Sequence, residues 1–223
     1  QVFAGETEGP VARVESLMML LSIAVHQGLT IFKVDIGSAF MRTPMADDVK
    51  HKWVKLDKRV VQILMEIQPD RCKQYILSDG SVIVKMKKLS YGYVKAAHYW
   101  WKDLTNTFTM DGYTVCMKDK CVFMKRRGEH VSYCATTVDD CLFTCTDEQS
   151  WKQEQIAMLR NKYEEITIED SEEIGLIGMH VKIDCGKKTI TLTQPKQVAR
   201  IIETFGVTKG APSPALTKLM GDD

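Results

Sequence analysis

The order of elements expected along this chain is typical of an α+β fold, in which antiparallel hairpins alternate with helices. Three observations predict it: apolar residues recur at helical spacing in several segments, short β-branched runs lie between these segments, and turn residues separate neighbouring runs. The chain has 223 residues, of which 44% are hydrophobic and 26% charged. It is therefore long enough to bury a core of this kind, with room for two lobes.

The first half of the chain is expected to hold helices separated by short strands. Leu17, Leu20 and Leu21 recur at helical spacing, which predicts a helix over 14–27 that ends at Gly28. The further elements expected are a strand over 31–36, a helix over 56–67 that ends near Pro69, strands over 74–77 and 82–86 around the hairpin signal Ser78-Asp79-Gly80-Ser81, and an aromatic-rich helix over 94–110.

The second half begins with a predicted meander of three strands. β-rich runs over 121–125, 131–138 and 141–145 are separated by the turn 126–129 and by Asp139-Asp140. The remaining elements expected are a helix from Asp147 to about Tyr163 with Asp147 as its N-cap, a hairpin of 176–183 and 189–193, a helix over 194–205 with Pro195 in its first turn, and an irregular tail from Thr208.

Charge and cysteine content limit the class of protein. The formal net charge is +1, so the total shows no strongly basic surface, although basic residues gather locally over 85–88 and 118–127. Taken alone, these clusters are also what a solvated face produces. No apolar run reaches the roughly 18 residues of a membrane span. The seven cysteines form no C-x-x-C pair, which favours reduced thiols in an intracellular protein.

Two neighbouring carboxylates, Asp139-Asp140, lie between mostly apolar β-rich runs. Aspartate is a favoured turn residue, so a solvated and inert turn explains such a pair when it stands alone. Asp35 changes this interpretation, because it also ends an apolar strand and small residues follow it. If the strand over 31–36 lies beside the hairpin of Asp139-Asp140, three carboxylates converge at strand ends.

Such a cluster suits two-metal nucleotidyl transfer. Two Mg²⁺ ions about 4 Å apart activate a primer 3′-hydroxyl and stabilise the leaving pyrophosphate, and Mg²⁺ prefers carboxylate and phosphate oxygens. Mn²⁺ is expected as a substitute. The small residues Gly37, Ser38 and Ala39 leave backbone N–H groups free to approach a triphosphate.

Several blocks of the sequence resemble, in the same order, the reverse transcriptase of copia-type LTR retrotransposons. Pro10-Val11-Ala12-Arg13 and Val34-Asp35-Ile36-Gly37-Ser38-Ala39-Phe40 resemble P-V-x-R/K … D-V-x-x-A-F, Leu89-Ser90-Tyr91-Gly92 … Trp100 resembles L-Y-G-L-K-Q-A-P-R-A-W, Thr137-Val138-Asp139-Asp140 resembles Y-V-D-D, Ile177-Gly178 resembles L-G, and Leu192-Thr193-Gln194 … Phe205-Gly206 resembles L-x-Q … F-G. Each block alone is weakly specific, but together they cover nearly the whole chain.

The resemblance implies a right-hand polymerase fold with an antiparallel palm sheet. Residues 1–30 and 41–90 correspond to partial fingers, residues 31–40 and 91–184 to the palm, and residues 185–223 to the start of the thumb. The implied activity is RNA-directed DNA synthesis on an RNA or DNA template with a primer and dNTPs. The implied context is a Pol polyprotein with integrase and ribonuclease H, in the cytoplasm or a virus-like particle and without a membrane.

The resemblance also implies roles for individual residues. Asp35, Asp139 and Asp140 match the catalytic, metal-binding acids of the family. Phe40 matches the aromatic gate that excludes a ribose 2′-hydroxyl. Among the other residues implied to bind substrate, Arg13 matches a basic fingers residue near the incoming phosphates, Tyr91 and Gly92 match the palm turn beside the nascent base pair, and Ser38 and Ala39 belong to the block that follows the first acid.

The chain departs from the family pattern at several positions. Thr137 stands where the pattern has Tyr, while Lys95 and Ala97 stand where it has Gln and Pro. Residues 166–170 replace an M-K-D-L-G block whose lysine is often proposed to protonate pyrophosphate. These departures, and a start inside the fingers, indicate a fragment of a polyprotein or a degenerate copy.

Three hypotheses follow. The first is an active polymerase, favoured by the three intact acids. The second is an inactive, retroelement-derived domain that binds nucleic acid or protein, favoured by the departures. The third is an unrelated α+β domain with incidental acids, which needs every block match to arise by chance.

Overall fold

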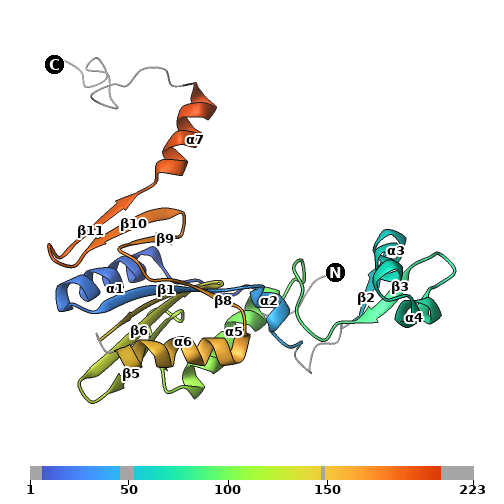
Figure 1. Ribbon diagram of the computed structural model, residues 1–223, viewed down its shortest axis with the longest axis horizontal. Coiled ribbons are helices and arrows are strands. Elements are labelled where there is room, and N and C mark those ends of the chain that lie inside the picture. Colours follow the sequence, from blue (N-terminus) through green and yellow to red (C-terminus); the bar gives the residue numbers. More distant parts are fainter. Residues whose placement is uncertain (1–6, 46–52, 147–148, 207–223) are drawn as a thin grey trace. The chain divides into compact units, whose positions relative to one another are not determined.

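The computed structural model describes residues 7–45, 53–146 and 149–206. The chain divides into two compact units, Gln1–Asp170 and Ser171–Asp223. Helices are interspersed with single strands and runs of strands along the sequence, and all the strand pairs of the described residues are antiparallel (Figure 1). The mixed arrangement of helices and antiparallel sheet agrees with the predicted α+β class.

A six-stranded sheet dominates the first unit. Its strand order is β4 (Thr114–Val115), β5 (Val122–Arg127), β6 (His130–Thr137), β7 (Asp140–Cys145), β1 (Thr30–Ile36) and β8 (Ile166–Glu169). The meander β5-β6-β7 confirms the three predicted strands, and β5 extends to Arg127 into the predicted turn. β1 joins this meander at β7, so residues more than 100 positions apart in sequence become neighbours.

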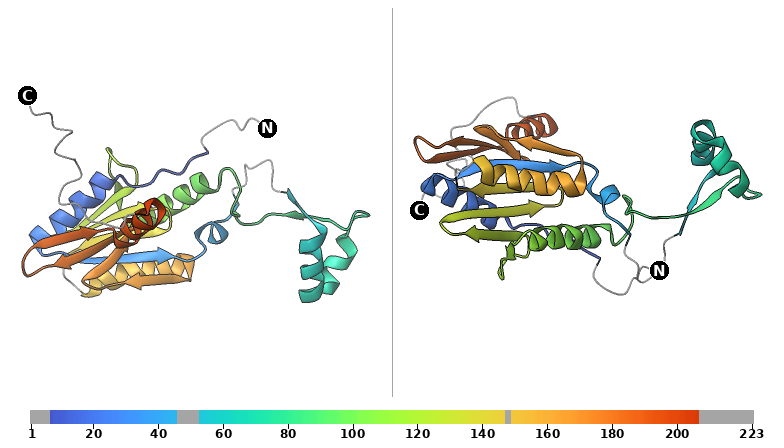
Figure 2. Two further views of the ribbon diagram at one scale, coloured as in Figure 1. Left: turned by 90° about the horizontal axis from the view of Figure 1, so that it is seen from above. Right: turned by 60° about the horizontal axis from the view of Figure 1, so that its bottom comes forward.

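The two faces of this sheet are covered by different helices. Alternate residues Phe32, Val34 and Ile36 of β1 are fully buried in a core formed with α5 (Ala96–Met110) and α6 (Gln149–Tyr163). The other face is met by α1 (Val14–Gln27), which contacts β1, β6 and β7 (Figures 1 and 2). The predicted helix over 14–27 is thus confirmed, and it ends at Gly28 in the left-handed conformation.

Aromatic rings fill much of the core between the sheet and α5 and α6. Phe32 of β1 and Phe143 of β7 stack with ring centroids 5.0 Å apart, and Phe108 of α5 stacks on Phe123 of β5 at 4.6 Å. Stacked rings from four elements, β1, β5, β7 and α5, bury large apolar areas, which stabilises the pairing of β1 with β7.

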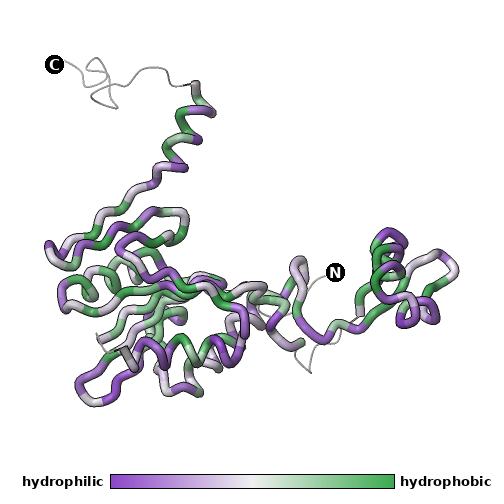
Figure 3. The backbone as a smooth tube through the Cα atoms, viewed as in Figure 1, coloured by the Kyte–Doolittle hydropathy of each residue, from purple (hydrophilic) through white to green (hydrophobic). Residues whose placement is uncertain are grey.

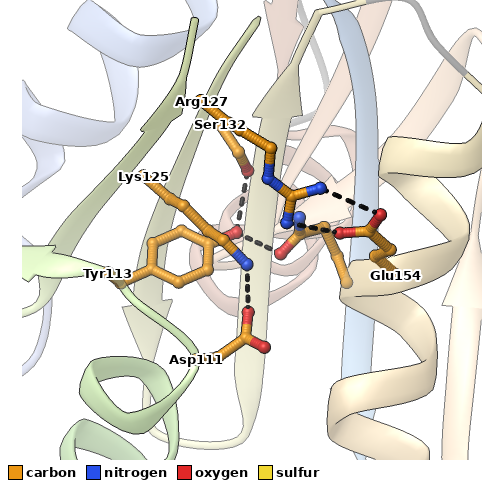
Figure 4. A network of polar contacts seen from close by, with 7 residues as sticks. Asp111, Tyr113, Lys125, Arg127, Ser132 and Glu154 are labelled. Carbon is orange, nitrogen blue, oxygen red and sulfur yellow. Dashed lines mark hydrogen bonds and ion pairs between the residues drawn. The ribbon is translucent and has the colours of Figure 1, made fainter.

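A polar network lies beside this core (Figure 4). The buried Tyr113 hydroxyl is 2.8 Å from Ser132 Oγ and donates to Gln155 Oε1. Lys125 Nζ donates to Asp111 Oδ2 at 2.6 Å. Arg127 and Glu154 form a two-pronged ion pair at 3.2 and 3.0 Å (Figure 4). These bonds satisfy polar groups at the border of the core and tie α6 to the sheet.

A small subregion formed by 53–85 corrects one prediction. The strand β3 (Val82–Lys85) pairs with β2 (Trp53–Leu56), and not with residues 74–77. The helices here are α3 (Lys58–Ile67), α4 (Pro69–Cys72) and the 3₁₀ helix η1 (Lys73–Tyr75). The predicted hairpin of 74–77 with 82–86 is therefore wrong, because a strand earlier in the chain takes the place of the local partner.

Other boundaries also differ from the sequence predictions. Leu56 ends β2, and Asp57 caps α3 by accepting hydrogen bonds from the N–H groups of Arg59 and Val60, so the helix begins at Lys58 instead of Leu56. The strands β4 and β8 were not expected. The predicted N-cap Asp147 and the tail from Thr208 lie outside the described residues.

The second unit contains a three-stranded antiparallel sheet in the order β11 (Thr189–Thr193), β10 (Met179–Asp184), β9 (Glu173–Leu176), followed by α7 (Pro195–Phe205). The predicted strand over 176–183 is split, because Ile177 and Gly178 both take positive φ and form a turn between β9 and β10. The hairpin of β10 and β11 is confirmed, and Pro195 begins α7 as predicted. Hydrophobic and hydrophilic residues alternate along α7 (Figure 3).

The cysteines and the helices bear on two predictions drawn from composition. All seven cysteines are free, which agrees with the predicted reduced thiols. In the part of the chain that the structure describes, no helix is both long and apolar enough to cross a membrane.

Candidate functional site

Three aspartates meet at one end of the six-stranded sheet. In the antiparallel pair of β1 and β7, Asp35 lies directly opposite Asp140. The backbone N–H of Ile36 donates to the carbonyl of Asp139 at 3.0 Å. The predicted convergence of the two strand ends is therefore present in the backbone pairing, although the first and last of these acids are 105 positions apart in sequence.

The turn that carries Asp139 is strained, and a hydrogen bond from Trp100 of α5 stabilises it. Thr137 pairs with Asp140, so Val138 and Asp139 form a two-residue hairpin loop. Val138 has φ 60, a left-handed conformation that is rare for a β-branched residue and costs about 1–2 kcal/mol. The indole Nε1 of Trp100 donates to the Val138 carbonyl at 2.7 Å. Such strain is characteristic of functional sites, where the surrounding structure maintains it.

A buried lysine, Lys33, is a member of the site that the sequence analysis missed. Lys33 and Asp35 point to the same face of β1, which is the face of Asp140, because side chains alternate along a strand. Lys33 Nζ is 3.2 Å from Asp140 Oδ1 and 2.6 Å from Glu169 Oε1. The side chain is only 9% exposed. The available signal was a charged residue two positions before Asp35 in an otherwise apolar strand.

Burial and mutual repulsion act on the carboxylates. Burial, followed by the charges of Asp139 and Asp140, raises the pKa of Asp35 above its ordinary value. The pKa of Asp140 is also raised, chiefly by burial, although the contact with Lys33 opposes this. Burial alone would lower the pKa of Lys33, but its contacts with Glu169 and Asp140 outweigh burial and raise it. The site thus holds negative charge that is only partly compensated.

The donor set is chemically suited to a hard divalent cation. Carboxylate oxygens are the ligands that Mg²⁺ and Mn²⁺ prefer, and repulsion among the acids favours a cation between them. In the conformation described, however, no three Asp, Glu, His or Cys side chains of 7–45, 53–146 and 149–206 are grouped so that they could hold one metal ion. The Asp140 carboxylate faces Lys33 instead, so it would have to exchange this partner for an ion.

The segment after Asp35 is fixed to Glu164 and Glu165, which lie between α6 and β8. The N–H of Gly37 donates to the carbonyl of Glu165 at 3.0 Å, and a Cβ at position 37 would lie 3.0 Å from the Glu165 side chain. The short helix α2 (Ala39–Arg42) follows, and its Arg42 forms ion pairs with Glu164 and Glu165. Ser38 is exposed with φ 55, whereas Ala39 is buried. The loop is therefore anchored at both ends.

The structure brings Phe40 together with Tyr91. Their rings meet edge to face with centroids 5.2 Å apart. Phe40 is half-buried against the core, Tyr91 is 63% exposed, and Gly92 has φ 83, which suits a glycine turn. The two aromatic residues predicted to contact substrate, Phe40 and Tyr91, therefore lie against each other, while their roles in substrate binding stay predictions.

Arg13 lies at the N-terminus of α1, at the same end of the sheet as the aspartate turn. The N–H of the preceding Ala12 donates to the carbonyl of Thr136 at 2.9 Å. The Arg13 side chain is exposed, and its backbone N–H donates to Asp119 Oδ2 at 3.0 Å. Ser16 Oγ donates to the same carboxylate at 2.6 Å, so Asp119 caps the helix in place of a local residue.

Comparisons with known proteins identify the family. A family model described as "Reverse transcriptase (RNA-dependent DNA polymerase)" matches residues 2–217. The chain is 25% identical over 225 residues to the retrovirus-related Pol polyprotein from transposon RE1 of Arabidopsis thaliana, covering 97% of this chain and 14% of the relative. It is 23% identical over 212 residues to the corresponding polyprotein from transposon TNT 1-94 of Nicotiana tabacum, covering 93% and 14%. The chain thus spans about a seventh of the length of these relatives.

Proposed function

The chain belongs to the reverse transcriptase (RNA-dependent DNA polymerase) family, with copia-type transposon polyproteins among its relatives, and from this premise we propose that it is an RNA-directed DNA polymerase core. It extends the 3′-hydroxyl of a primer with dNTPs on an RNA or DNA template. The observation that carries the proposal is the pairing of Asp35 with Asp140 across β1 and β7, beside the turn that holds Asp139.

In this proposal the elements correspond to the parts of a right-hand polymerase. The six-stranded sheet with α5 and α6 is the palm, and the subregion of β2, β3 and α3 belongs to partial fingers. The segment from residue 185, which includes β11 and α7, is the start of the thumb. This division is supported by the order of the matched blocks along the chain.

The carboxylates of Asp35, Asp139 and Asp140 bind the metal ions. Two Mg²⁺ ions, or Mn²⁺ in their place, supply activation of the primer hydroxyl and charge neutralisation on the pyrophosphate. The N–H groups of the segment that contains Ser38 and Ala39 approach the triphosphate. Because Gly37 and Arg42 are both tied to the α6–β8 turn, this segment is held in place before substrate binds.

The remaining predicted residues bind and orient substrate. Phe40 lies beneath the incoming sugar and excludes a ribose 2′-hydroxyl, with Tyr91 and Gly92 beside the nascent base pair. Arg13, exposed at the N-terminus of α1, approaches the incoming phosphates. We further propose that the chain acts as part of a Pol polyprotein, as its relatives' names suggest, in the cytoplasm or a virus-like particle.

A second candidate is an inactive domain that keeps the fold and binds nucleic acid or protein. The observation that favours it is the Lys33–Asp140 ion pair, which engages one of the three acids. The departures from the family pattern at Thr137, Lys95 and Ala97 point the same way.

A primer-extension assay separates the two candidates. The chain is incubated with a DNA primer on an RNA or a DNA template, dNTPs, and either Mg²⁺, Mn²⁺ or a chelator. Active polymerase gives metal-dependent extension that Asp139→Asn abolishes. The control Asp184→Asn alters an acid outside the aspartate cluster and leaves extension intact. No extension by a chain that is folded and binds template-primer supports the inactive domain instead.

A further inference from the structure

Lys33 is a cation in direct contact with one of the proposed metal-binding acids, Asp140. Lys33 belongs to β1, which lies between β7 and β8 in the sheet. Its ammonium group contacts an acid of each neighbouring strand, Asp140 of β7 and Glu169 of β8. A lysine that is only 7% exposed is uncommon, and such residues are normally paired with acids. The distance from Nζ to Glu169 Oε1 is 2.6 Å, whereas the distance to Asp140 Oδ1 is 3.2 Å. Glu169 is therefore the closer of the two partners.

We propose that Lys33 is a positioning residue that competes with divalent cations for Asp140, and that Glu169 sets the strength of this competition by holding the ammonium group. The inference rests on the proposed function, because it requires that the aspartates bind metal. In the metal-free protein the ammonium compensates part of the acidic cluster. When an ion binds Asp140, Lys33 gives up this carboxylate and keeps Glu169.

The geometry supports an exchange between two partners. Asp140 and Glu169 flank Lys33 on opposite sides, so the flexible lysine side chain can leave one acid without losing the other. Glu169 has a 38% exposed side chain and lies on the outermost strand β8, on the side of Lys33 away from β7. An ammonium held there repels an incoming cation less than one held at Asp140, because the interaction of two charges weakens with distance.

The proposal predicts opposite effects for the two partners of the same ion pair. Lys33→Gln removes the competing charge, so the dissociation constant for Mn²⁺ falls by roughly threefold to tenfold. Glu169→Gln leaves Lys33 with Asp140 alone, so the dissociation constant for Mn²⁺ rises by a similar factor. A purely structural ion pair gives no such difference in sign, because the loss of either partner then acts only on folding.

The experiment measures Mn²⁺ binding to the full chain without nucleic acid, by electron paramagnetic resonance of free Mn²⁺ and by the metal-dependent shift in melting temperature. Lys152→Gln is the matched control. Its ammonium also pairs with an acid, Asp170, and its side chain is 12% exposed, but it lies over the ring of Phe32 on the opposite face of β1. We expect it to lower the melting temperature without changing the dissociation constant for Mn²⁺.

Lys33→Arg keeps the positive charge and is the variant to use if Lys33→Gln does not fold. The affinity of Lys33→Arg for Mn²⁺ is expected to stay near that of the wild type. Unchanged affinity in both Lys33→Gln and Glu169→Gln, or a change of the same sign, overturns the role of Lys33 while the metal site stands. If the wild type binds no Mn²⁺, or binds it as tightly as Asp139→Asn does, the metal site of the proposed function falls, and this inference falls with it.

Discussion

The indole Nε1 of Trp100 donates a hydrogen bond to the backbone carbonyl of Val138, 2.7 Å away. This bond joins the long helix α5 to the turn that places Asp139 beside Asp35. Trp100 is 2% exposed and also meets Tyr163 edge to face at 5.1 Å. The helix therefore acts as a support for a turn whose own backbone conformation is unfavourable.

Replacement of this support should destabilise the protein. Trp100→Phe removes the hydrogen bond and leaves a small cavity, so we expect the free energy of unfolding to fall by roughly 1–3 kcal/mol. Urea denaturation followed by circular dichroism measures this change. The matched control is Trp53→Phe, because Trp53 is 63% exposed and its replacement should stay within about 0.5 kcal/mol. Equal effects of the two substitutions would show that the bond to Val138 contributes little.

The strain at Val138 leads to a second prediction. Val138→Gly relieves about 1–2 kcal/mol of left-handed strain but adds roughly 0.5–1 kcal/mol of chain entropy to the unfolded state. Since the valine is 42% exposed, little packing is lost. We therefore expect unchanged stability or a gain of up to about 1 kcal/mol in the same denaturation assay.

Thr137→Gly is the control for this substitution. Thr137 is a strand residue of β6 and is not among the residues with positive φ, so glycine there should cost roughly 0.5–1 kcal/mol. A loss of the same size in Val138→Gly would argue that the turn is not strained.

The raised pKa of Asp35 predicts a pH dependence of stability. A carboxyl group with a raised folded-state pKa holds its proton more strongly in the folded protein than in the unfolded chain. The contribution of Asp35 to the free energy of unfolding is therefore most favourable at a pH below its ordinary pKa of 3.8. This contribution is lost as the pH rises through the raised folded-state pKa. Asp35→Asn removes this loss, so at pH 7 the variant should be more stable than the wild type, by less than about 1 kcal/mol.

The measurement is the difference between the urea denaturation curves of wild type and Asp35→Asn from pH 3.5 to 7. This difference isolates Asp35 from the other titrating groups. Asp140→Asn provides the contrast, because it takes a charged partner from buried Lys33 and should bring no comparable gain. A difference that is flat with pH contradicts a pKa of Asp35 raised by burial and by repulsion from Asp139 and Asp140.

The sequence predicts best those parts of the site whose partners are close in the chain. The hairpin that carries Asp139 and Asp140 is recognisable because β6 and β7 are consecutive runs of strand-forming residues. Asp35 could be placed beside it only through the shared character of two apolar strands that end in acids. The pairing of β1 with β7 confirms this placement.

The sequence does not predict strand partners and ion-pair partners that are distant in the chain. β8 is a short run, Ile-Thr-Ile-Glu, and its partner residues in β1 lie at least 130 positions earlier, so no local pattern indicates that Glu169 faces Lys33. The same cause explains the wrong hairpin over 74–77 and 82–86. β3 pairs with β2, whose four residues precede a strongly amphipathic helix and merge with it in the hydrophobic pattern.

The contact between Phe40 and Tyr91 allows the proposed sugar gate to be tested. Phe40→Ala opens space beneath the incoming sugar, so we expect the ratio of ribonucleotide to deoxyribonucleotide incorporation to rise roughly tenfold or more. The physical reason is that an overpacked contact costs about 1–3 kcal/mol, and about 1.4 kcal/mol corresponds to a factor of ten in rate. Single-nucleotide primer extension with matched NTP and dNTP pairs measures this ratio.

Tyr91→Phe is the matched control, because it keeps the ring that meets Phe40 edge to face and removes only the hydroxyl. It should leave the incorporation ratio unchanged. Phe40 is half-buried, so Phe40→Ala also costs stability, and its melting temperature must confirm that the variant is folded at the assay temperature. If folded Phe40→Ala extends primers with the wild-type ratio, Phe40 is a packing residue for Tyr91 and the core, and the discrimination between sugars must come from another residue. The proposed carboxylate site does not depend on this result, because Asp35, Asp139 and Asp140 are placed by strand pairing and not by the ring of Phe40.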